Sequence, residues 1–443
     1  MKKLIKSFTE ACGKLVDKIL PDAYLFAVIL TGVTFVMCLI FTDATAGQTF
    51  VAWGDGVWNL LEFTSQMATI MVFGYAFSKT PIMEKFLDKM CHYVKTPKQA
   101  YFFTSAASAI LSWICWPAGL ICGGFIALKL GRKIKKVHFP LLVASAYSGF
   151  LVFQNGLTGT HLILNTPGTW SEELVGLIPP TETFLTSWNL FISLILGVVV
   201  VPYLMTLVAP SDDKVIELDI DKVPEEKPRE KVKLKGLAFN DWLENNYFIN
   251  LFLGLALMGY IVYYFVNGGG LTINSTNLIF MALGILFTPT PIEFVNRCVE
   301  GAHTAGGVIM QFPIYAGIQG MMLTTGLASV IADGFVAIST AKNLPMWSFL
   351  SAGLVNVFIP SGGSQWVAQG PVMLEAAANL GADIPRTAMG VFLGNSWTNM
   401  IQPFWAIPLL SIANVKAKDI IGYLVPVLIA SGTIITLVLV YWP

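Results

Sequence analysis

The chain has 443 residues, 55% of them apolar and only 12% charged, and its formal net charge is zero. Soluble globular proteins carry about twice this share of charged residues, so the composition predicts an integral membrane protein and excludes an ordinary soluble domain. A chain without excess positive charge is poorly suited to nucleic acid or an acidic polymer. We expect its partners to be the lipid bilayer, a small solute and a second copy of the chain.

The first spans can be oriented from lysines, because cytoplasmic loops are enriched in lysine and arginine. Apolar spans are predicted over about 23–41 and 57–78. The segment before them and the segment after them are both basic, so we expect the N-terminus and residues 79–98 to lie inside. The N-terminal lysines are Lys2, Lys3, Lys6, Lys14 and Lys18.

The next apolar stretch, Tyr101–Leu128, has basic segments on both sides. A single crossing would place one of these segments outside, against the charge rule. A re-entrant hairpin satisfies the rule, and Trp116–Gly119, with the sequence WPAG, lies where the hairpin must turn. We therefore predict a hairpin near 100–128 that enters the membrane from the cytoplasm.

Two further spans, about 140–165 and 184–208, complete the first half of the chain. The polar, charge-mixed stretch that follows contains Pro224 and Pro228 and is typical of a linker. We predict a first repeat over 1–210, a cytoplasmic linker over 211–245 and a second repeat over 246–443.

The second half is expected to repeat this plan. A second broken segment, near 346–378, is centred on Pro360–Gly363 and is predicted to enter from outside. Two spans near 386–412 and 420–442 follow it, and the C-terminus is expected outside. Before the second broken segment we expect three spans, at about 247–266, 275–289 and 301–324, and an extracellular turn at about 333–342.

The two halves align weakly at an offset of about 244, as the internal repeats of transporters do. In this alignment Pro117 matches Pro360, and Asn155 matches Asn399. We therefore predict an all-α polytopic membrane protein with two inverted repeats, about nine transmembrane spans and two re-entrant hairpins.

The second broken segment carries the strongest candidate for a binding site. Glycine and proline at membrane depth release backbone groups that protein, water or a ligand must satisfy. A half-helix that opens at these glycines would point its free N–H groups at an anion, so a carboxylate could bind without arginine. A packing face of small residues is the alternative. The candidate substrate-binding residues here are Ser361, Gly362, Gly363, Ser364 and Gln365.

A polar run inside the span that follows, Asn395–Pro403, is a candidate ion site. Its amide and hydroxyl oxygens, with carbonyls freed by Pro403, suit a small hard cation such as sodium. Hydrogen bonds between helices are the alternative. The candidate ion-binding residues are Asn356, Asn395, Ser396 and Thr398, and Asn399 and Gln402 are added to the substrate set.

The first half offers a counterpart in Gln154–His161, which is also polar and rich in glycine. Asn155 and Thr158 are therefore further candidates for substrate binding. His161 could titrate near neutrality and relay a proton, or it could simply be hydrogen-bonded. Gln311 and Gln319 lie in a third interrupted span, where they could face the cavity or bridge neighbouring helices.

Several blocks of sequence closely resemble the bacterial short-chain fatty acid transporter family, and the likeness covers nearly the whole chain. This resemblance implies short carboxylates such as acetoacetate and butyrate as substrates. The blocks are Trp53–Leu61, Gln311–Pro313, Tyr315–Gln319, Pro360–Gly363, Gln369–Pro371 and Gln402–Ala406.

More distantly, the chain is similar to sodium-coupled dicarboxylate carriers. That similarity implies a homodimer in which a domain with two hairpins moves against a scaffold, an elevator-type mechanism. Those carriers have Ser-Asn-Thr motifs at both hairpin tips, where this chain has Pro117-Ala118-Gly119 and Pro360–Gly363. The coupling ion, Na⁺ or H⁺, therefore stays open.

Together these features predict a secondary active transporter of small monocarboxylates in the bacterial cytoplasmic membrane, driven by cation symport. The tail of the substrate is expected against Trp366, Trp397 or Phe404. A cation/proton antiporter and a solute sensor without transport are the alternatives. The sequence contains no nucleotide, zinc or nucleophile motif, so we expect no enzyme, no metal site and no cofactor beyond the coupling ion.

Overall fold

The structure is a computed structural model that describes residues 2–19, 23–166, 169–220, 238–270 and 272–443. All regular secondary structure within these ranges is helical. Four helical segments there are long and apolar enough to cross a membrane, and a fifth is obtained if α16 (Gly306–Thr324) and α17 (Leu327–Val336), which meet at a 60° bend, form one span. The four segments are Tyr24–Phe41, Ser187–Leu207, Tyr247–Val266 and Ala417–Tyr441.

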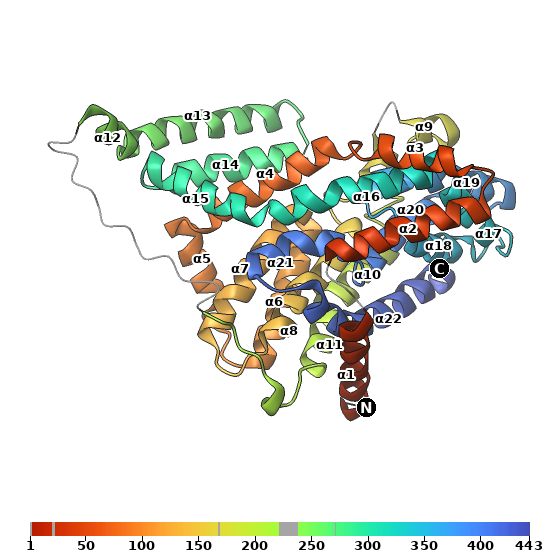
Figure 1. Cartoon of the computed structure of the whole chain (residues 1–443), viewed down its shortest axis with the longest axis horizontal. Helices are drawn as coiled ribbons and strands as arrows, with labels where there is room; N and C mark the ends of the chain where they lie inside the picture. The colour runs from red at the N-terminus through yellow and green to blue at the C-terminus, as the bar shows by residue number, and fades with distance from the viewer. Residues whose placement is uncertain (1, 20–22, 167–168, 221–237, 271) are drawn as a thin grey trace.

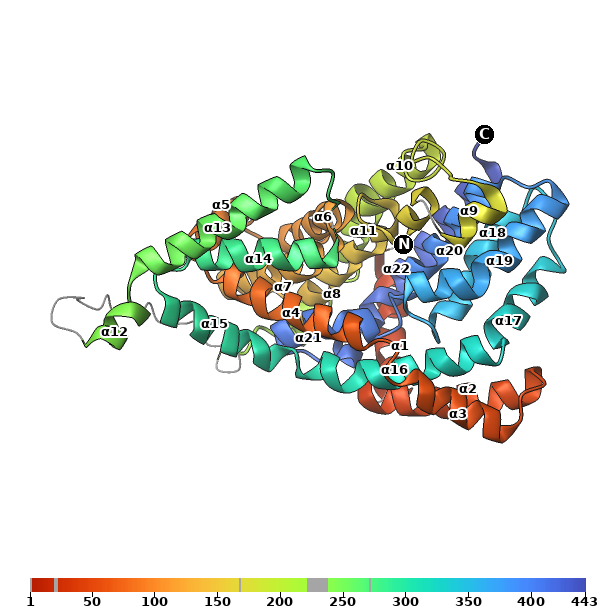
Figure 2. The ribbon, with the colours of Figure 1, turned by 90° about the horizontal axis from the view of Figure 1, so that it is seen from above.

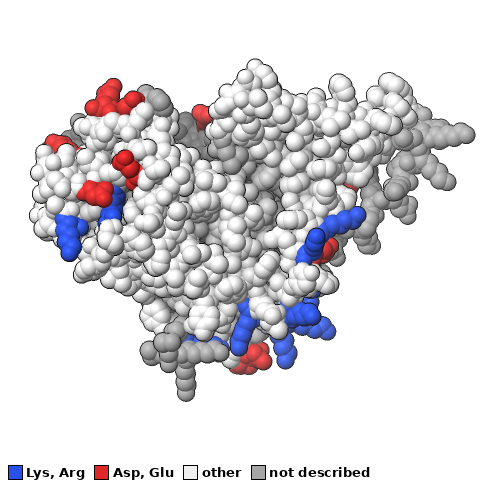
Figure 3. All heavy atoms as spheres, turned by 180° about the vertical axis from the view of Figure 1, so that it is seen from behind, with Lys and Arg blue, Asp and Glu red and all other residues white. Residues whose placement is uncertain are grey.

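This architecture confirms the predicted all-α polytopic membrane protein. The face shown in Figure 3 is largely uncharged, and its charged side chains gather toward the periphery. The long helix α13 (Tyr247–Val266) leaves most of its apolar side chains exposed, including Phe252 at 78%. Such a surface is stable only against lipid or another protein. The number of spans and the inverted repeat remain predictions.

One group of helices packs through glycine. In it, α3 (Ala46–Gly56) lies along α16 (Gly306–Thr324), as Figure 2 shows. A Cβ atom on Gly320 would lie 2.5 Å from the carbonyl oxygen of Ala52, so only glycine permits this approach. The other members are α2 (Ala23–Phe41), α4 (Leu61–Ser78), α14 (Ile273–Phe287) and α15 (Pro291–Thr304).

The first predicted hairpin corresponds to α6 (Pro97–Ile114) and α7 (Trp116–Lys133), which are separated by the extended residue Cys115. The two helices run antiparallel and close together, because a Cβ on Gly119 would lie 2.5 Å from the backbone nitrogen of Ser112. The short helix α5 (Pro81–Cys91) leads from α4 into this pair. The side of the membrane from which the pair enters stays a prediction.

The prediction of a span over 140–165 is wrong in one respect, because the helix is interrupted within this range. Helix α8 (Phe139–Ser148) passes into a 3₁₀ helix, η1 (Gly149–Asn155), and regular structure stops until a second 3₁₀ helix, η2 (Thr160–Asn165). The chain breaks where the backbone of Gly156 lies against Trp113, since a Cβ there would be 2.0 Å from the Trp113 carbonyl oxygen. Hydropathy alone does not reveal such a contact.

The rest of the first half contains one continuous apolar span, in which the π-helical turn η3 joins α10 to α11, followed by the start of the predicted linker. Residues 211–220 lie against the first half, where the Ile216 carbonyl accepts a 2.8 Å hydrogen bond from the Phe139 N–H. Residues 221–237 of the linker lie outside the described residues. The elements are α9 (Trp170–Val175), α10 (Ser187–Leu194), η3 (Ile195–Val200), α11 (Val201–Leu207), η4 (Asp212–Lys214) and α12 (Phe239–Glu244).

The second broken segment forms α18 (Leu344–Asn356) and α19 (Gly362–Leu380). They run antiparallel, since Gln365 Nε2 donates to the Ala352 carbonyl at 2.7 Å. Helix α17 (Leu327–Val336) occupies part of the predicted turn over 333–342. The predicted span over 386–412 is interrupted after α20 (Ile384–Thr398) and continues as η5 (Phe404–Ala406) and α21 (Ile407–Ala413).

The long helix α22 (Ala417–Tyr441) ends the chain, and α1 (Lys2–Ile19) packs across it. In Figure 1, α4, α13, α14 and α15 gather at one end of the molecule, and α17 to α20 gather at the other. Helices α6, α7, α8 and α21 lie between these two groups, so both broken helix pairs border the centre of the molecule.

Candidate functional site

A cavity of about 310 Å³ lies where the N-termini of α7 and α19 meet. The break at 158–160 forms part of its wall, and α4 and the start of α14 close it from another side. Among the described residues that line the cavity, none is charged. They are Phe63, Trp116, Pro117, Phe153, Thr158, Gly159, Thr160, Leu162, Thr272, Ile273, Thr276, Ser361, Gly362, Gly363 and Trp405.

The N-terminus of α19 supplies the polar end of this cavity. Ser361 caps the helix, and its carbonyl accepts from the Gln365 N–H at 2.9 Å. A Cβ on Gly362 would lie 2.7 Å from both Gln154 Nε2 and Thr160 Oγ1, so this position admits only glycine. Gly363 is different, because the single neighbour of its Cβ position is Thr160 Cγ2 at 3.8 Å.

The N-terminus of α7 approaches the same cavity, and the Trp116 N–H donates to Thr158 Oγ1 at 3.1 Å. A helix N-terminus carries a partial positive charge. At α7 the Trp116 N–H is paired and Pro117 has none, so free N–H donors come from the start of α19. Two such termini at one uncharged cavity favour an anionic group over a cation.

Aromatic rings form another part of the wall, next to these N-termini. The Trp405 ring lies edge-on to Trp116 at 5.1 Å and to Phe63 at 5.7 Å, and it is 6.2 Å from Phe153. Trp405 Nε1 donates to the Pro360 carbonyl at 2.8 Å, which fixes the ring beside the break before α19. The cavity thus combines an anion-binding end with an apolar surface.

Comparison with known proteins agrees with this chemistry. Residues 4–442 match the sequence model of the family described as short chain fatty acid transporter. The chain belongs to this family. It is therefore a membrane transporter and not an enzyme.

Two relatives, from Escherichia coli K12 and Haemophilus influenzae, carry the provisional name of short-chain fatty acid transporter. The first is 36% identical, over 97% of this chain and 98% of its own length. The second is 35% identical, over 95% of this chain and 96% of its own length. A solved structure, the Alcanivorax borkumensis YdaH transporter, aligns with 94% of this chain and 96% of its own, at 14% identity and a TM-score of 0.45. That likeness is too low for an argument about fold or mechanism.

Behind the cavity, the transporter contains a buried network of side-chain amides. Gln154 Nε2 donates to Asn395 Oδ1 at 3.0 Å, and Asn395 Nδ2 donates to Asn356 Oδ1 at 2.7 Å and to Gln365 Oε1 at 2.9 Å. The network joins the η1 segment, α18, α19 and α20. Each of these oxygens already accepts a hydrogen bond from an amide, so a cation there would have to share it with that donor.

The network extends through Asn356, whose Nδ2 donates to Thr398 Oγ1 at 3.0 Å and to Asn399 Oδ1 at 2.8 Å. Ser396 is not part of it, because its hydroxyl donates to the Leu393 carbonyl in its own helix at 3.0 Å. The structure therefore brings together Asn356, Asn395 and Thr398 of the predicted ion site. Cation binding there stays a prediction.

Of the predicted substrate residues, Thr158, Ser361, Gly362 and Gly363 line the cavity, and the others do not. Three of the others have hydrogen-bond partners elsewhere: Ser364 Oγ accepts from Gln319 Nε2 at 2.7 Å, Asn155 Nδ2 donates to Asn189 Oδ1 at 2.7 Å, and Gln402 Oε1 accepts from the Phe404 N–H at 2.7 Å.

His161 is fully buried, with its ring 4.9 Å from that of Phe184, and neither ring nitrogen has a hydrogen-bond partner in the described part of the chain. It is separate from the lining of the cavity, and its role as a proton relay stays a prediction.

The prediction that the substrate tail lies against Trp366, Trp397 or Phe404 is wrong, because none of these rings lines the cavity. Trp366 packs against Phe392 at 4.9 Å, Trp397 Nε1 donates to the Leu428 carbonyl at 2.7 Å, and Phe404 stacks on Phe312 at 4.0 Å. Trp405 lines the cavity instead. Phe404 and Trp405 both belong to the block Gln402–Ala406, so the signal was present, but the sequence does not show which of two adjacent rings faces inward.

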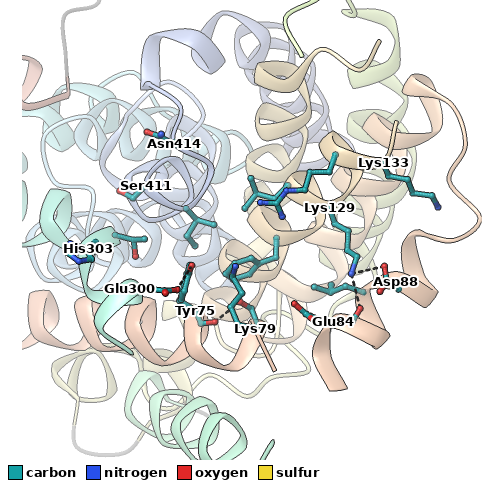
Figure 4. A pocket seen from close by; sticks show the side chains of 17 residues that line it. Tyr75, Lys79, Glu84, Asp88, Lys129, Lys133, Glu300, His303, Ser411 and Asn414 are labelled. Atoms are coloured by element: carbon teal, nitrogen blue, oxygen red, sulfur yellow. Dashed lines mark hydrogen bonds and ion pairs between the residues drawn. The ribbon is translucent and has the colours of Figure 1, made fainter. Parts of the chain in front are cut away.

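A second cavity, of about 830 Å³, lies farther along the same elements and is rich in charge (Figure 4). Lys129 Nζ lies 2.7 Å from Asp88 Oδ1 and bridges α7 to α5. The labelled side chains that line this charged cavity are Tyr75, Lys79, Glu84, Asp88, Lys129, Lys133, Glu300, His303, Ser411 and Asn414.

The two cavities are joined by shared elements. Helix α4 reaches from Phe63 to Tyr75, α7 from Trp116 to Lys133, and η5 with α21 from Trp405 to Ser411. Buried apolar side chains lie between them on α4 and α7, namely Met67, Ile70, Met71, Leu120 and Ile121. An apolar layer therefore separates the uncharged cavity from the charged one.

Proposed function

We propose that this transporter moves short monocarboxylates, of the butyrate and acetoacetate class, across the bacterial cytoplasmic membrane. The observation that carries the proposal is the uncharged cavity lined both by two helix N-termini and by aromatic rings. The carboxylate would accept hydrogen bonds from the N–H groups of Gly362 and Gly363 at the start of α19. The short apolar tail would lie against Trp116, Trp405 and Phe63.

This arrangement suits a monocarboxylate better than a dicarboxylate. Charge-assisted hydrogen bonds from backbone N–H groups hold one carboxylate well, whereas no basic side chain among the described lining residues could pair with a second carboxylate, whose desolvation would be costly. A cavity of about 310 Å³ also has room for an acid of a few carbons with some water.

Alternating access would follow from movement of the two helix pairs relative to α4 and α14. Phe63 and Thr276 close the cavity from α4 and α14, and the charged cavity lies farther along α4. An elevator-type movement would carry the substrate toward the charged cavity, whose lysines suit the cytoplasmic side. Two inverted repeats, a homodimer, an N-terminus inside and a C-terminus outside belong to this proposal.

Coupling to a cation, Na⁺ or H⁺, would drive accumulation of the acid. The test is uptake of labelled butyrate or acetoacetate into liposomes that contain the purified protein, with a sodium gradient, a proton gradient or neither. Uptake accelerated by one gradient is the expected result. Folded protein that takes up neither acid under any gradient would contradict carboxylate transport and favour a cation antiporter or a sensor.

A further inference from the structure

One face of α16 carries buried polar atoms that have no partner. Gln311, Tyr315 and Gln319 are four residues apart, so their side chains lie one above another on the same face. All three are buried, and Gln311 Oε1, Tyr315 Oη and Gln319 Oε1 have no hydrogen-bond partner in the described structure. Buried polar atoms are nearly always paired with protein or water, so three in a row mark a place where something else binds.

The break between α20 and η5 faces this stripe and contributes two more such atoms. Asn399 Nδ2 and Gln402 Nε2 are buried and also lack a partner among the described residues. The break lies next to the stripe because the Tyr315 ring is 5.0 Å from the Phe404 ring, and the Phe404 N–H donates to Gln402 Oε1 at 2.7 Å. All five unpaired atoms thus lie along one interface.

The stripe ends at the two cavities. At one end, Gln319 Nε2 donates to Ser364 Oγ at 2.7 Å, next to Gly363 of the uncharged cavity. At the other end, a Cβ on Gly307 would lie 3.8 Å from Gln311 Nε2 and 3.7 Å from Ser411 Oγ. Ser411 lines the charged cavity (Figure 4). The stripe therefore connects the two cavities past the apolar layer.

We propose that this interface is a hydrated path and binding site for sodium ions between the charged cavity and the tip of α19. The proposal rests on the proposed function, because it names the ion that would drive carboxylate transport. Neutral amide and hydroxyl oxygens are ligands for a hard monovalent cation. The stripe, Gln311, Tyr315 and Gln319, contains no carboxylate or imidazole that could carry a proton.

This site differs from the one predicted at Asn356 and Asn395. Those side-chain oxygens accept hydrogen bonds from neighbouring amides, whereas the oxygens of Gln311 and Gln319 are unused. Asn399 and Gln402 contribute N–H donors for water and not ligands for the ion, because their oxygens already accept from Asn356 Nδ2 and from the Phe404 N–H.

The test compares the Tyr315→Phe and Gln319→Leu variants with Tyr263→Phe, which changes an exposed tyrosine on α13. Butyrate uptake into liposomes is measured against sodium concentration, with choline as the replacement ion. We expect the sodium concentration for half-maximal uptake to rise about tenfold in the first two variants, as for loss of one ligand. In these two variants the butyrate concentration for half-maximal uptake at saturating sodium should stay unchanged. The Tyr263→Phe variant should have the same sodium dependence as the native protein.

Binding of ²²Na⁺ to the purified protein without carboxylate provides a second readout that does not require transport. We expect binding by the native protein and Tyr263→Phe, and about tenfold weaker binding by Tyr315→Phe. Butyrate uptake that depends only on a proton gradient, or on no gradient, would overturn the sodium path and leave carboxylate transport intact. The sodium path would also be overturned if the variants changed thermal stability but neither the sodium dependence of uptake nor ²²Na⁺ binding. The stripe would then hold ordered water only.

Discussion

Phe63 reaches the uncharged cavity from α4, whereas Trp116, Phe153 and Trp405 reach it from segments next to the breaks. Its ring stacks on Phe312 at 5.8 Å and meets the edge of Trp405 at 5.7 Å. Because these rings limit the apolar part of the cavity, the side chain of Phe63 should determine the length of tail that fits.

The Phe63→Ala variant should therefore favour longer acids. Each buried methylene group contributes about 0.8 kcal/mol, or about fourfold in affinity, so the ratio of hexanoate uptake to butyrate uptake should rise about tenfold. Competition of unlabelled acids with labelled butyrate measures this ratio. The Phe73→Ala variant is the control, because Phe73 lies on the same helix but stacks on Phe294 at 6.3 Å. An equal ratio in both variants would exclude Phe63 as a determinant of chain length.

Part of this site follows from the sequence. Gly362, Gly363 and Thr158 stand out because glycine and hydroxyl groups interrupt apolar segments, and the structure places all three at the cavity. The aromatic wall does not follow, because the sequence is rich in aromatic residues and Pro403 is followed by Phe404 and Trp405 in succession. Which ring faces inward depends on the direction of a short 3₁₀ turn, which no periodic pattern records.

Among the elements, α3 and α16 make a close contact between helix backbones. Gly56 and Gly320 face each other there, and a Cβ on either would lie within 3 Å of the other residue's Cα atom. The approach lets the backbones pack without side chains between them, a common basis of helix association in membranes.

The Gly320→Ala variant should lower thermal stability in detergent, by about 1–3 kcal/mol, because the added methyl group meets backbone atoms that cannot turn aside. The Gly306→Ala variant in the same helix is the control, since nothing lies within 4 Å of its Cβ position. Melting temperatures of the two proteins provide the comparison. A Gly320→Ala protein as stable as the Gly306→Ala protein would show that α3 and α16 can move apart without loss of stability.

The positions of the helix breaks could be predicted only where the local sequence determines them. Pro117 and Pro360 lie near the breaks at Cys115 and before Gly362, as the proline and glycine signals indicate. The break at Gly156 was missed because Leu151, Val152 and Phe153 before it are apolar, and the interruption depends on Trp113 of another helix. A tertiary contact, and not the hydropathy of the local sequence, therefore determines where this helix ends.

At the scale of the whole molecule, the start of the linker is attached to the first half through His138. The His138 Nδ1 accepts from the Ile216 N–H at 3.0 Å, and Nε2 lies 2.8 Å from the Tyr423 hydroxyl of α22. The Tyr101 hydroxyl accepts from the His138 N–H at 2.8 Å. A neutral imidazole thus connects the linker to α22, in the turn between α7 and α8.

This junction should make stability depend on pH. Burial lowers the pKa of His138 from 6.5 to about 4, so the unfolded chain takes up the proton first. The contribution of the neutral ring is complete above about pH 6.5 and is lost as the pH falls toward 4. The melting temperature of the native protein should fall more steeply between pH 7 and 5 than that of His138→Gln. Equal slopes would contradict a buried neutral histidine here.

The central claim is that the carboxylate binds at the N-terminus of α19. Its most direct test is butyrate uptake by liposomes that contain equal amounts of folded Gly363→Ala or Gly363→Leu protein. The Cβ of alanine fits, since its nearest neighbour is Thr160 Cγ2 at 3.8 Å, so Gly363→Ala should retain uptake near the native level. Leucine would fill the cavity and cover the N–H groups, so uptake should fall at least about tenfold. Native uptake by Gly363→Leu would show that the carboxylate binds elsewhere.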